Sequence, residues 1–308
     1  MTLAPIALFV YNRPTHTEQT LEALFKNIFA KESTLYIFCD GPKAGATIED
    51  LDMISRTRAI IKSKQWCKDV IVKEYSTNQG LANSIISGVT EVLNAFDSII
   101  VLEDDILAGP GFLKYMNDAL NVYKEEEKVG CIHAWNYDLD MADEKASTFF
   151  LKGADCWGWA TWKRGWEHFN ADGSFLLKHI KKKNLEYEFN RRGTYDYLNM
   201  LKNQINGKND SWAIRWHASL FIHNMFCLQP VKPIVRNIGL DNSGTHCTTL
   251  KIEQQPVDYI NVQRIEIVED DLFFESYRRS LEKGVKMNRF EKITNLFKAV
   301  MRKIGNRY

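Results

Sequence analysis

The sequence lacks the features that would place it in several large protein classes. It has no apolar run long enough to cross a membrane, and its first residues, Met1–Pro5, include no basic residue of the kind that opens a signal peptide. Its formal net charge is only +1, so no overall field favours a nucleic acid. Internal repeats and low-complexity linkers are also missing. We therefore expect a folded cytoplasmic protein that does not bind nucleic acid.

Cysteine pairs with redox or metal-ligand spacing are absent as well. The six cysteines are scattered along the chain without a C-x-x-C pair, and Cys39 and Cys131 lie in apolar, strand-like segments. This pattern is typical of reduced thiols in a cytosolic protein and not of a disulfide framework.

The sequence does contain a regular alternation of predicted strands and helices in its first part. Its 308 residues, 45% of them hydrophobic, are enough for one large α/β domain or two small ones. The pattern predicts strand 6–11, helix 15–30 with Thr15 and Glu18 as a capping box, strand 35–39, helix 47–66, strand 70–75, helix 81–96 and strand 99–102. Such alternation is typical of a parallel, doubly wound sheet of nucleotide-binding type.

Three consecutive acids end the last of these strands. The apolar run Ile99–Leu102 reads as a strand buried on both faces, and Glu103, Asp104 and Asp105 follow it directly. Three carboxylates cannot share that burial unless a positive group lies beside them. Ligands of open α/β sheets bind outside the carboxyl ends of the strands. The pattern therefore predicts a divalent-cation site here, with a solvated acidic turn as the alternative.

Other polar residues follow the neighbouring strands. Arg13, Asp40 and Asn78 come after the first, second and third predicted strands. Because the carboxyl ends of parallel strands lie along one edge of a sheet, we expect these side chains to converge on the crevice that holds the acids. The alternatives are a surface position at a helix start for Arg13 and ordinary turn chemistry for Asp40.

The second half of the chain is rich in aromatic residues. Trp157 and Trp159 flank Gly158, and Trp162 follows. Tryptophans grouped in this way form either core packing or a platform for the faces of sugar rings, and both interpretations stay open. In this half the pattern also predicts a strand at 129–132, a polar helical stretch at 174–206 and a strand at 230–237.

Four motifs, taken in order, resemble a known family. These are Phe9-Val-Tyr-Asn-Arg-Pro14, Cys39-Asp-Gly41, Val101-Leu-Glu-Asp-Asp105 and Gly158-Trp159. Together they resemble nucleotide-sugar glycosyltransferases of the GT-A fold, and the pattern is most similar to inverting N-acetylglucosaminyltransferase I and bacterial family 2-like sugar transferases. The similarity covers roughly residues 4–247. It implies a Rossmann-like, mostly parallel sheet with flanking helices.

The resemblance implies a role for each strand-end residue. Arg13 would contact the nucleotide diphosphate, Asp40 the base, and Glu103 and Asp104 the donor ribose and sugar. We also place Asn78 in the donor-binding set, because it follows the third predicted strand.

The resemblance also implies a metal and a base. Asp105 would hold Mn²⁺ or Mg²⁺, and His246 resembles a C-terminal histidine that many such enzymes place near the metal or diphosphate. A structural role is the alternative for His246. Asp210, in Asn209-Asp-Ser-Trp212, would be the general base that an inverting transfer needs. Asp155 is the rival base, and a helix N-cap is the alternative role for Asp210.

The sequence also indicates how the chain is divided. We expect a GT-A domain at 1–250, with a nucleotide-binding half at 1–106 and an acceptor half at 107–250, followed by a C-terminal helical extension at 251–308. Apolar residues at spacings of three and four, opposite a basic face, predict an amphipathic helix near the C-terminus. Such a helix either lies on an anionic membrane surface or docks on the domain.

Taken together, the residues and the resemblance predict a metal-dependent inverting glycosyltransferase. The donor would be a UDP-sugar such as UDP-GlcNAc, and the acceptor a glycan or lipid-linked saccharide of surface polysaccharide synthesis. The alternatives are a sugar nucleotidyltransferase and a non-catalytic carbohydrate-binding protein on the same fold. A nucleotidyltransferase usually has a Gly-rich, basic phosphate loop after its first strand, which Tyr11-Asn-Arg-Pro14 is not.

Overall fold

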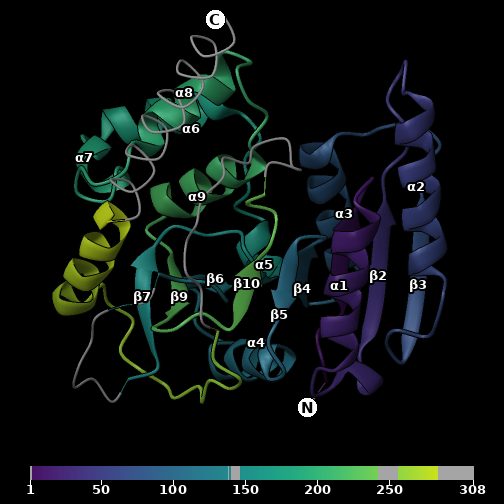
Figure 1. Ribbon diagram of the computed structural model, residues 1–308. Helices are drawn as coiled ribbons and strands as arrows, with labels where there is room; N and C mark the ends of the chain where they lie inside the picture. Colours follow the sequence, from purple (N-terminus) through teal and green to yellow (C-terminus); the bar gives the residue numbers. More distant parts are fainter. Residues whose placement is uncertain (1, 138, 140–145, 242–255, 284–308) are drawn as a thin grey trace, which may run out of the picture.

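The computed structural model describes residues 2–137, 139, 146–241 and 256–283. In its first part, strands and helices alternate as the sequence predicts (Figure 1). The elements are β1 (Ile6–Val10), α1 (Pro14–Phe25), η1 (Ala30–Glu32), β2 (Thr34–Cys39), α2 (Ile48–Ile61), β3 (Asp69–Glu74), α3 (Leu81–Ala95) and β4 (Ser98–Glu103). The four strands pair in parallel in the order β3-β2-β1-β4.

The second part of the chain extends the same sheet. Its strands are β6 (Val129–His133), β7 (Thr148–Lys152), β8 (Trp159–Trp162) and β9 (Phe226–Pro230). The full order is β3-β2-β1-β4-β8-β6-β9-β7. Strand β8 runs antiparallel to both neighbours and β7 runs antiparallel to β9. All other neighbouring strands of this sheet pair in parallel, so the sheet is mostly parallel. The predicted α/β class, with a Rossmann-like, mostly parallel sheet and flanking helices, is confirmed.

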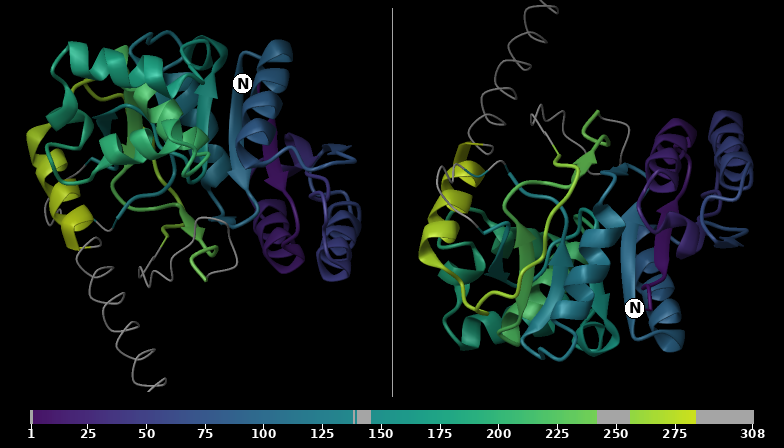
Figure 2. Two further views of the ribbon diagram at one scale, coloured as in Figure 1. Left: turned by 90° about the horizontal axis from the view of Figure 1, so that it is seen from above. Right: turned by 90° about the horizontal axis from the view of Figure 1, so that it is seen from below.

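Helices cover both faces of this sheet (Figure 2). Side chains alternate along β1, so Ile6 and Leu8 pack in one core with α1 and α4 (Phe112–Val122), whereas Ala7 and Phe9 pack in another with α3 and α9 (Trp212–Ile222). The remaining helices are α5 (Lys163–Trp166), α6 (Gly173–Lys182), α7 (Glu186–Phe189), α8 (Tyr197–Ile205) and a helix at 271–283.

The central strand β4 is buried as its sequence predicts. Ile99, Ile100 and Val101 are fully buried, and Leu102 nearly so. Strand β8 then places the carboxyl end of β4 beside the second half of the chain, because Val101 pairs with Trp159. The predicted halves 1–106 and 107–250 therefore share one sheet.

Some predicted boundaries are wrong. Pro14 takes the first position of α1, where its fixed backbone angle and missing N–H suit a helix start, so Arg13 is the N-cap and the predicted capping box at Thr15 does not form. Helix α1 ends at Phe25 and α2 at Ile61, both earlier than predicted.

Two longer predicted elements are also divided. The stretch 174–206 is three helices, because Asn184, Arg191 and Arg192 adopt left-handed backbone angles that a helix cannot contain. The predicted strand 230–237 is the end of β9 followed by a separate strand, β10 (Val235–Asn237). Strand β10 pairs antiparallel with β5 (Ile106–Ala108) in a small second sheet.

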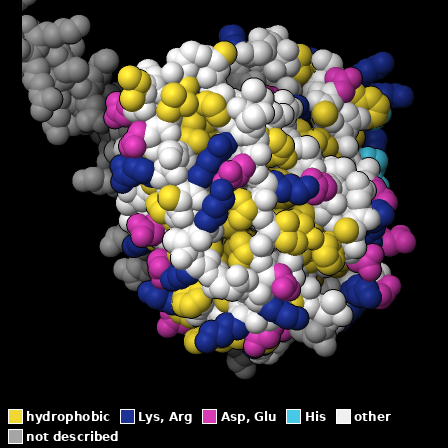
Figure 3. Space-filling model, turned by 90° about the vertical axis from the view of Figure 1, so that its right-hand side faces the viewer, with side chains coloured by type: hydrophobic (Ala, Val, Ile, Leu, Met, Phe, Trp, Pro, Cys, Tyr) yellow, Lys and Arg dark blue, Asp and Glu magenta, His cyan; other side chains and the backbone are white. Residues whose placement is uncertain are grey.

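The outer surface beside β3 is mixed in character. Acidic and basic side chains are interspersed with small hydrophobic patches on the side of the molecule that carries α2 and β3 (Figure 3). Strand β3 is an edge strand, and it carries Asp69, Lys73 and Glu74. Charges at such positions disfavour pairing with a strand of another molecule.

The chain after the sheet returns to pack on it. Phe273, Phe274 and Tyr277 of the helix at 271–283 form one cluster with Phe149 of β7, and this helix lies beside β7 in Figure 1. The predicted amphipathic helix of the C-terminal region, with its membrane interaction, lies outside the described residues. Within the described part of the chain, no helix is long and apolar enough to cross a membrane. The cysteines described there are all free.

Candidate active site

The acids after β4 and the arginine after β1 come together. Arg13 Nη1 lies 3.0 Å from Asp105 Oδ2, and Arg13 Nε donates a hydrogen bond of 3.3 Å to Asp104 Oδ2. A second contact joins Arg13 Nη2 to Asp104 Oδ1. The strands β1 and β4 are neighbours, so their carboxyl ends place these three side chains at one edge of the sheet. For Arg13, this is the convergence that the sequence predicts.

The acid cluster, defined as Glu103, Asp104 and Asp105, has three acidic groups beside the single positive charge of Arg13. Burial raises the pKa of Glu103 above its usual range, and the charges of Asp105 and Asp104 raise it further. Burial also raises the pKa of Asp104, although the charge of Arg13 acts in the opposite direction. A divalent cation at this position would relieve the excess negative charge.

The carboxylates of the acid cluster suit a metal ion that binds together with a phosphate-containing molecule. In the described ranges, no three His, Cys, Asp or Glu side chains are arranged so as to hold a metal by themselves. Mg²⁺ is usually held by one or two carboxylates together with phosphate oxygens and water. Asp105 fits such a role. His246, the other predicted metal ligand, lies outside the described residues.

Asp40, which is predicted to contact the nucleotide base, holds a loop in place. Asp40 Oδ1 accepts hydrogen bonds from the backbone N–H groups of Gly41 at 2.8 Å and Gln79 at 2.7 Å. Asp40 Oδ2 accepts from Asn78 Nδ2 at 2.9 Å and from the backbone N–H of Gly80 at 3.1 Å. The structure thus brings Asp40 and Asn78 together, and these bonds occupy the carboxylate. Contact with the nucleotide base stays a prediction for Asp40, and donor binding stays a prediction for Asn78.

A later segment forms a wall against the acid cluster. The backbone N–H of Ile238 donates to the carbonyl oxygen of Asp105 at 2.9 Å, and a Cβ added to Gly239 would lie 2.1 Å from Asp105 Oδ2. Asp241 Oδ2 lies 3.2 Å from His16 Nε2 on α1. The sequence pattern singles out neither Gly239 nor His16. No local signal predicts these contacts, because they join distant parts of the chain.

The rival base Asp155 contacts Cys156 and His133. Its Oδ1 accepts a hydrogen bond of 3.0 Å from the backbone N–H of Cys156 and lies 3.7 Å from His133 Nε2. Burial raises the pKa of the Cys156 thiol, and the charges of Asp155, Glu103 and Asp105 raise it further. Cys156 therefore lies within electrostatic range of both Asp155 and the acid cluster.

The predicted base Asp210 lies just before α9. Its exposed carboxylate pairs with Arg215 Nη2 at 3.0 Å. The N-cap of α9 is Ser211, so the alternative role of Asp210 as an N-cap is wrong. Trp212 stacks on Trp159 at 5.4 Å between ring centroids, and Trp159 pairs with Val101 near the end of β4. The start of α9, with Asp210, thus lies toward the edge of the sheet that carries the acids.

The tryptophans divide into core and surface. Trp159 and Trp162 are buried, so they belong to the core. Trp157 is partly exposed and packs edge-on against Trp135, with ring centroids 4.6 Å apart. Trp135 packs in the same way on Tyr137 at 4.8 Å. Of the three predicted platform residues, Trp157 alone offers part of its surface to a ligand.

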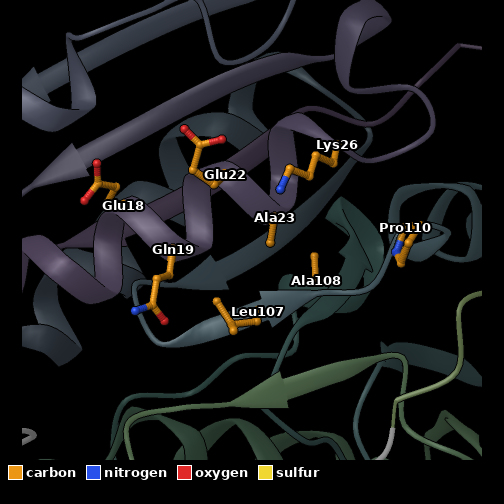
Figure 4. A pocket seen from close by; sticks show the side chains of 8 residues that line it. All are labelled: Glu18, Gln19, Glu22, Ala23, Lys26, Leu107, Ala108 and Pro110. Carbon is orange, nitrogen blue, oxygen red and sulfur yellow. The ribbon is translucent and has the colours of Figure 1, made fainter.

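A groove elsewhere on the molecule contains none of these residues. It lies between α1 and β5, has a volume of about 530 Å³ and is shown in Figure 4. Its lining residues are Glu18, Gln19, Glu22, Ala23, Lys26, Leu107, Ala108 and Pro110. No predicted site residue lines it, so we place the candidate active site at the acid cluster.

Known proteins resemble the chain only distantly. No family model and no curated protein matches the sequence. Staphylococcus aureus TarS, residues 1–349, is 13% identical over 57% of this chain and 49% of its own, with a TM-score of 0.31. Mouse xyloside xylosyltransferase 1 is 10% identical over 63% of this chain and 77% of its own, with a TM-score of 0.36.

Another solved structure is a UDP-glucose pyrophosphorylase complexed with UDP-glucose, 12% identical over 54% of this chain and 79% of its own, with a TM-score of 0.31. In a second TarS structure the match spans 24% of that chain, so this chain spans between a quarter and a half of the TarS structures. Similarity at this level does not identify a reaction. We therefore infer the function from the residues of the site.

The buried side chain of His217 makes the free energy of unfolding depend on pH. Burial, aided by the charge of Arg191, lowers the pKa of His217 from 6.5 to about 3. The folded state keeps this imidazole neutral, whereas the unfolded chain takes up its proton near pH 6.5. We expect the contribution of His217 to be complete above pH 6.5 and to fall by about 3 kcal/mol between pH 7 and pH 4.

Urea unfolding from pH 4 to pH 7 measures this effect. His217→Gln removes the titrating group, so its free energy of unfolding should decline less steeply toward pH 4 than that of the wild type. Equal slopes for the two proteins would contradict the assignment.

Proposed function

We propose that the protein is a metal-dependent inverting glycosyltransferase. It would move a sugar from a nucleotide sugar to a glycan or lipid-linked saccharide. The proposed donor is a UDP-sugar such as UDP-GlcNAc. The observation that supports this best is the contact of Arg13 with Asp104 and Asp105 at the carboxyl ends of two neighbouring parallel strands. An arginine and a carboxylate-bound cation are the groups that a departing diphosphate requires.

The donor would be held from three sides. Asp105 would hold Mn²⁺ or Mg²⁺, which supplies a Lewis acid for the diphosphate when it is bound. Arg13 would donate hydrogen bonds to the same diphosphate, and its contacts with Asp104 and Asp105 keep its guanidinium at the strand ends. Glu103 and Asp104 would accept hydrogen bonds from donor hydroxyl groups.

The nucleotide base would lie against the loop 78–80. Asp40 fixes this loop through backbone N–H groups, so the base would meet a preformed surface. Asn78 is held by the same carboxylate. We therefore infer that Asp40 fixes the shape of the surface that would bind the nucleotide base, in addition to its predicted contact with that base.

The acceptor hydroxyl would lose its proton to Asp210. Its exposed carboxylate is open to an incoming hydroxyl, and Arg215 fixes one of its oxygens. The deprotonated hydroxyl would attack the anomeric carbon from the side opposite the diphosphate, so the configuration would invert. Asp155 is the second carboxylate near the acid cluster and stays the rival base.

A panel of nucleotides tests the proposal. UDP and a set of UDP-, GDP- and dTDP-sugars would be added with Mn²⁺, with Mg²⁺ or with EDTA, and thermal shift and donor hydrolysis would be followed. We expect UDP and at least one UDP-sugar to raise Tm only with a divalent cation, and the same sugar nucleotide to be hydrolysed slowly. If no nucleotide bound in a metal-dependent way, the proposal would fail.

A further inference from the structure

A buried arginine on the acceptor side forms no ion pair with any residue that the structure describes. Arg191 lies between α7 and α8 in a left-handed backbone conformation, with φ of 51°, and is 2% exposed. Its Nη1 donates to the carbonyl oxygen of Lys152 at 2.8 Å. Within the described ranges, its Nε and Nη2 have no hydrogen-bond partner. Among the residues that the structure describes, no carboxylate forms an ion pair with it.

Such an arrangement costs stability. A buried charge without a partner is among the most expensive features of a protein, and so is a buried N–H group without an acceptor. The rings of Tyr197 and Tyr277 lie near the guanidinium, with centroids 6.0 and 5.8 Å from its central carbon, and they compensate only in part. The unmet donors call for an explanation.

The geometry of the unmet donors points to one kind of ligand. Nε–H and Nη2–H lie on the same side of the guanidinium and point in parallel. This edge binds two oxygens of one carboxylate or phosphate group at once. A single hydroxyl group would satisfy only half of it.

The surroundings are also suited to a saccharide. His217 Nε2 and Gln229 Nε2 are likewise buried without a partner among the residues described. The charge of Asp155 acts on Arg191 and also on Tyr137, Tyr195, Tyr197 and Tyr277, so these groups lie around it. We call this set, from Asp155 to Arg191, the Arg191 region.

Aromatic contacts link the Arg191 region to the neighbourhood of the acid cluster. Asp155, Tyr137 and Tyr195 are partly exposed, so the outer part of the region meets solvent. Tyr137 packs on Trp135, which packs on the partly exposed Trp157. Trp157 follows Cys156, which lies within electrostatic range of both Asp155 and the acid cluster. Sugar rings pack well on such aromatic faces.

We propose that the Arg191 region is the acceptor subsite and that it takes a saccharide with an anionic group, whose two oxygens pair with Nε and Nη2 of Arg191. The group is a carboxylate of an acidic sugar or a phosphate. Both N–H groups are shielded, so the partly exposed ring of Tyr197 turns aside as the anion enters. The word acceptor rests on the proposed transfer reaction, whereas anion binding at Arg191 does not.

Anion-dependent thermal shift tests this subsite. D-glucuronate represents an acidic sugar, inorganic phosphate represents a phosphoryl group, and glucose is the neutral control. We expect one of the two anions, but not glucose, to raise Tm of the wild type in a saturable way. The anion that acts identifies the source of the charge.

Variants locate the binding. Arg191→Met should lose the anion-dependent shift, and Arg191→Lys should need at least ten times more anion, because lysine lacks the paired donors. Arg13→Gln, which removes the arginine of the donor site, should keep the shift. The Tm and the circular dichroism of each variant without anion report whether that variant folds. If the Arg191→Met variant does not fold, the anion dependence of the Arg191→Lys variant decides the test.

Two outcomes would overturn the subsite. One is an anion shift that survives in both Arg191 variants, and the other is a wild type that responds to neither anion. If UDP and Mn²⁺ bind but no anion does, the subsite fails and the proposed function stands. If an anion binds through Arg191 but no nucleotide binds, the proposed function fails and the anion site stands.

Discussion

Asp105→Asn abolishes metal-dependent use of the donor while the protein stays folded. We expect Mn²⁺-dependent donor cleavage to fall roughly a thousand-fold, because the amide keeps the shape of the side chain but removes the proposed anionic ligand of the metal. Stability should change by less than about 1 kcal/mol, since Arg13 keeps Asp104 as a partner and the crowding of like charges is reduced.

Calorimetric titration of UDP in the presence of Mn²⁺, together with urea unfolding, measures both effects. Asp118→Asn is the matched control. Asp118 is a carboxylate on α4 that pairs with Lys114, and its loss should leave UDP binding unchanged. Metal-dependent UDP binding of wild-type strength in the Asp105 variant would remove Asp105 from the metal site.

Asp210→Asn should separate donor binding from transfer. The variant keeps the affinity for UDP and Mn²⁺ and loses transfer by about 10²–10⁴-fold, the usual contribution of a general base. Its carboxylate is exposed and pairs only with Arg215 among the described residues, so the fold should tolerate the change.

Asp155→Asn is the discriminating partner of that experiment. If Asp210 is the base, the Asp155 variant should mainly raise the KM for the acceptor, since Asp155 lies among the tyrosines of the Arg191 region and not in the base role. The reverse pattern, with kcat lost in the Asp155 variant and retained in the Asp210 variant, would transfer the role of base to Asp155. Loss of UDP binding in the Asp210 variant would move that residue to the donor site.

The first half of the fold follows from local patterns. The strands β1 to β4 and the helices between them come from short-range periodicity, and the buried run before Glu103 predicts its own position in the centre of the sheet. The meeting of Arg13 with Asp104 and Asp105 follows as well, because neighbouring parallel strands end at one edge.

The second half depends on contacts that no local pattern contains. Strand β8 enters the sheet antiparallel between β4 and β6, and β10 reaches back to β5. The pattern at Thr15 predicts a cap, but Pro14 overrides it. Arg191 could not be singled out either, because its buried and unmet N–H groups follow from the tertiary packing of residues distant in sequence.

The approach of Gly239 to Asp105 has a consequence for the order in which the molecule is assembled. The ribosome delivers β1 to β4 and the acids after β4 first, because synthesis begins at the N-terminus. Strand β10 and Gly239, which close one side of the acid cluster, are made much later. The first half therefore carries its charges before the chain contains the wall beside them, and the acid cluster is complete only when nearly the whole described sheet has been synthesised.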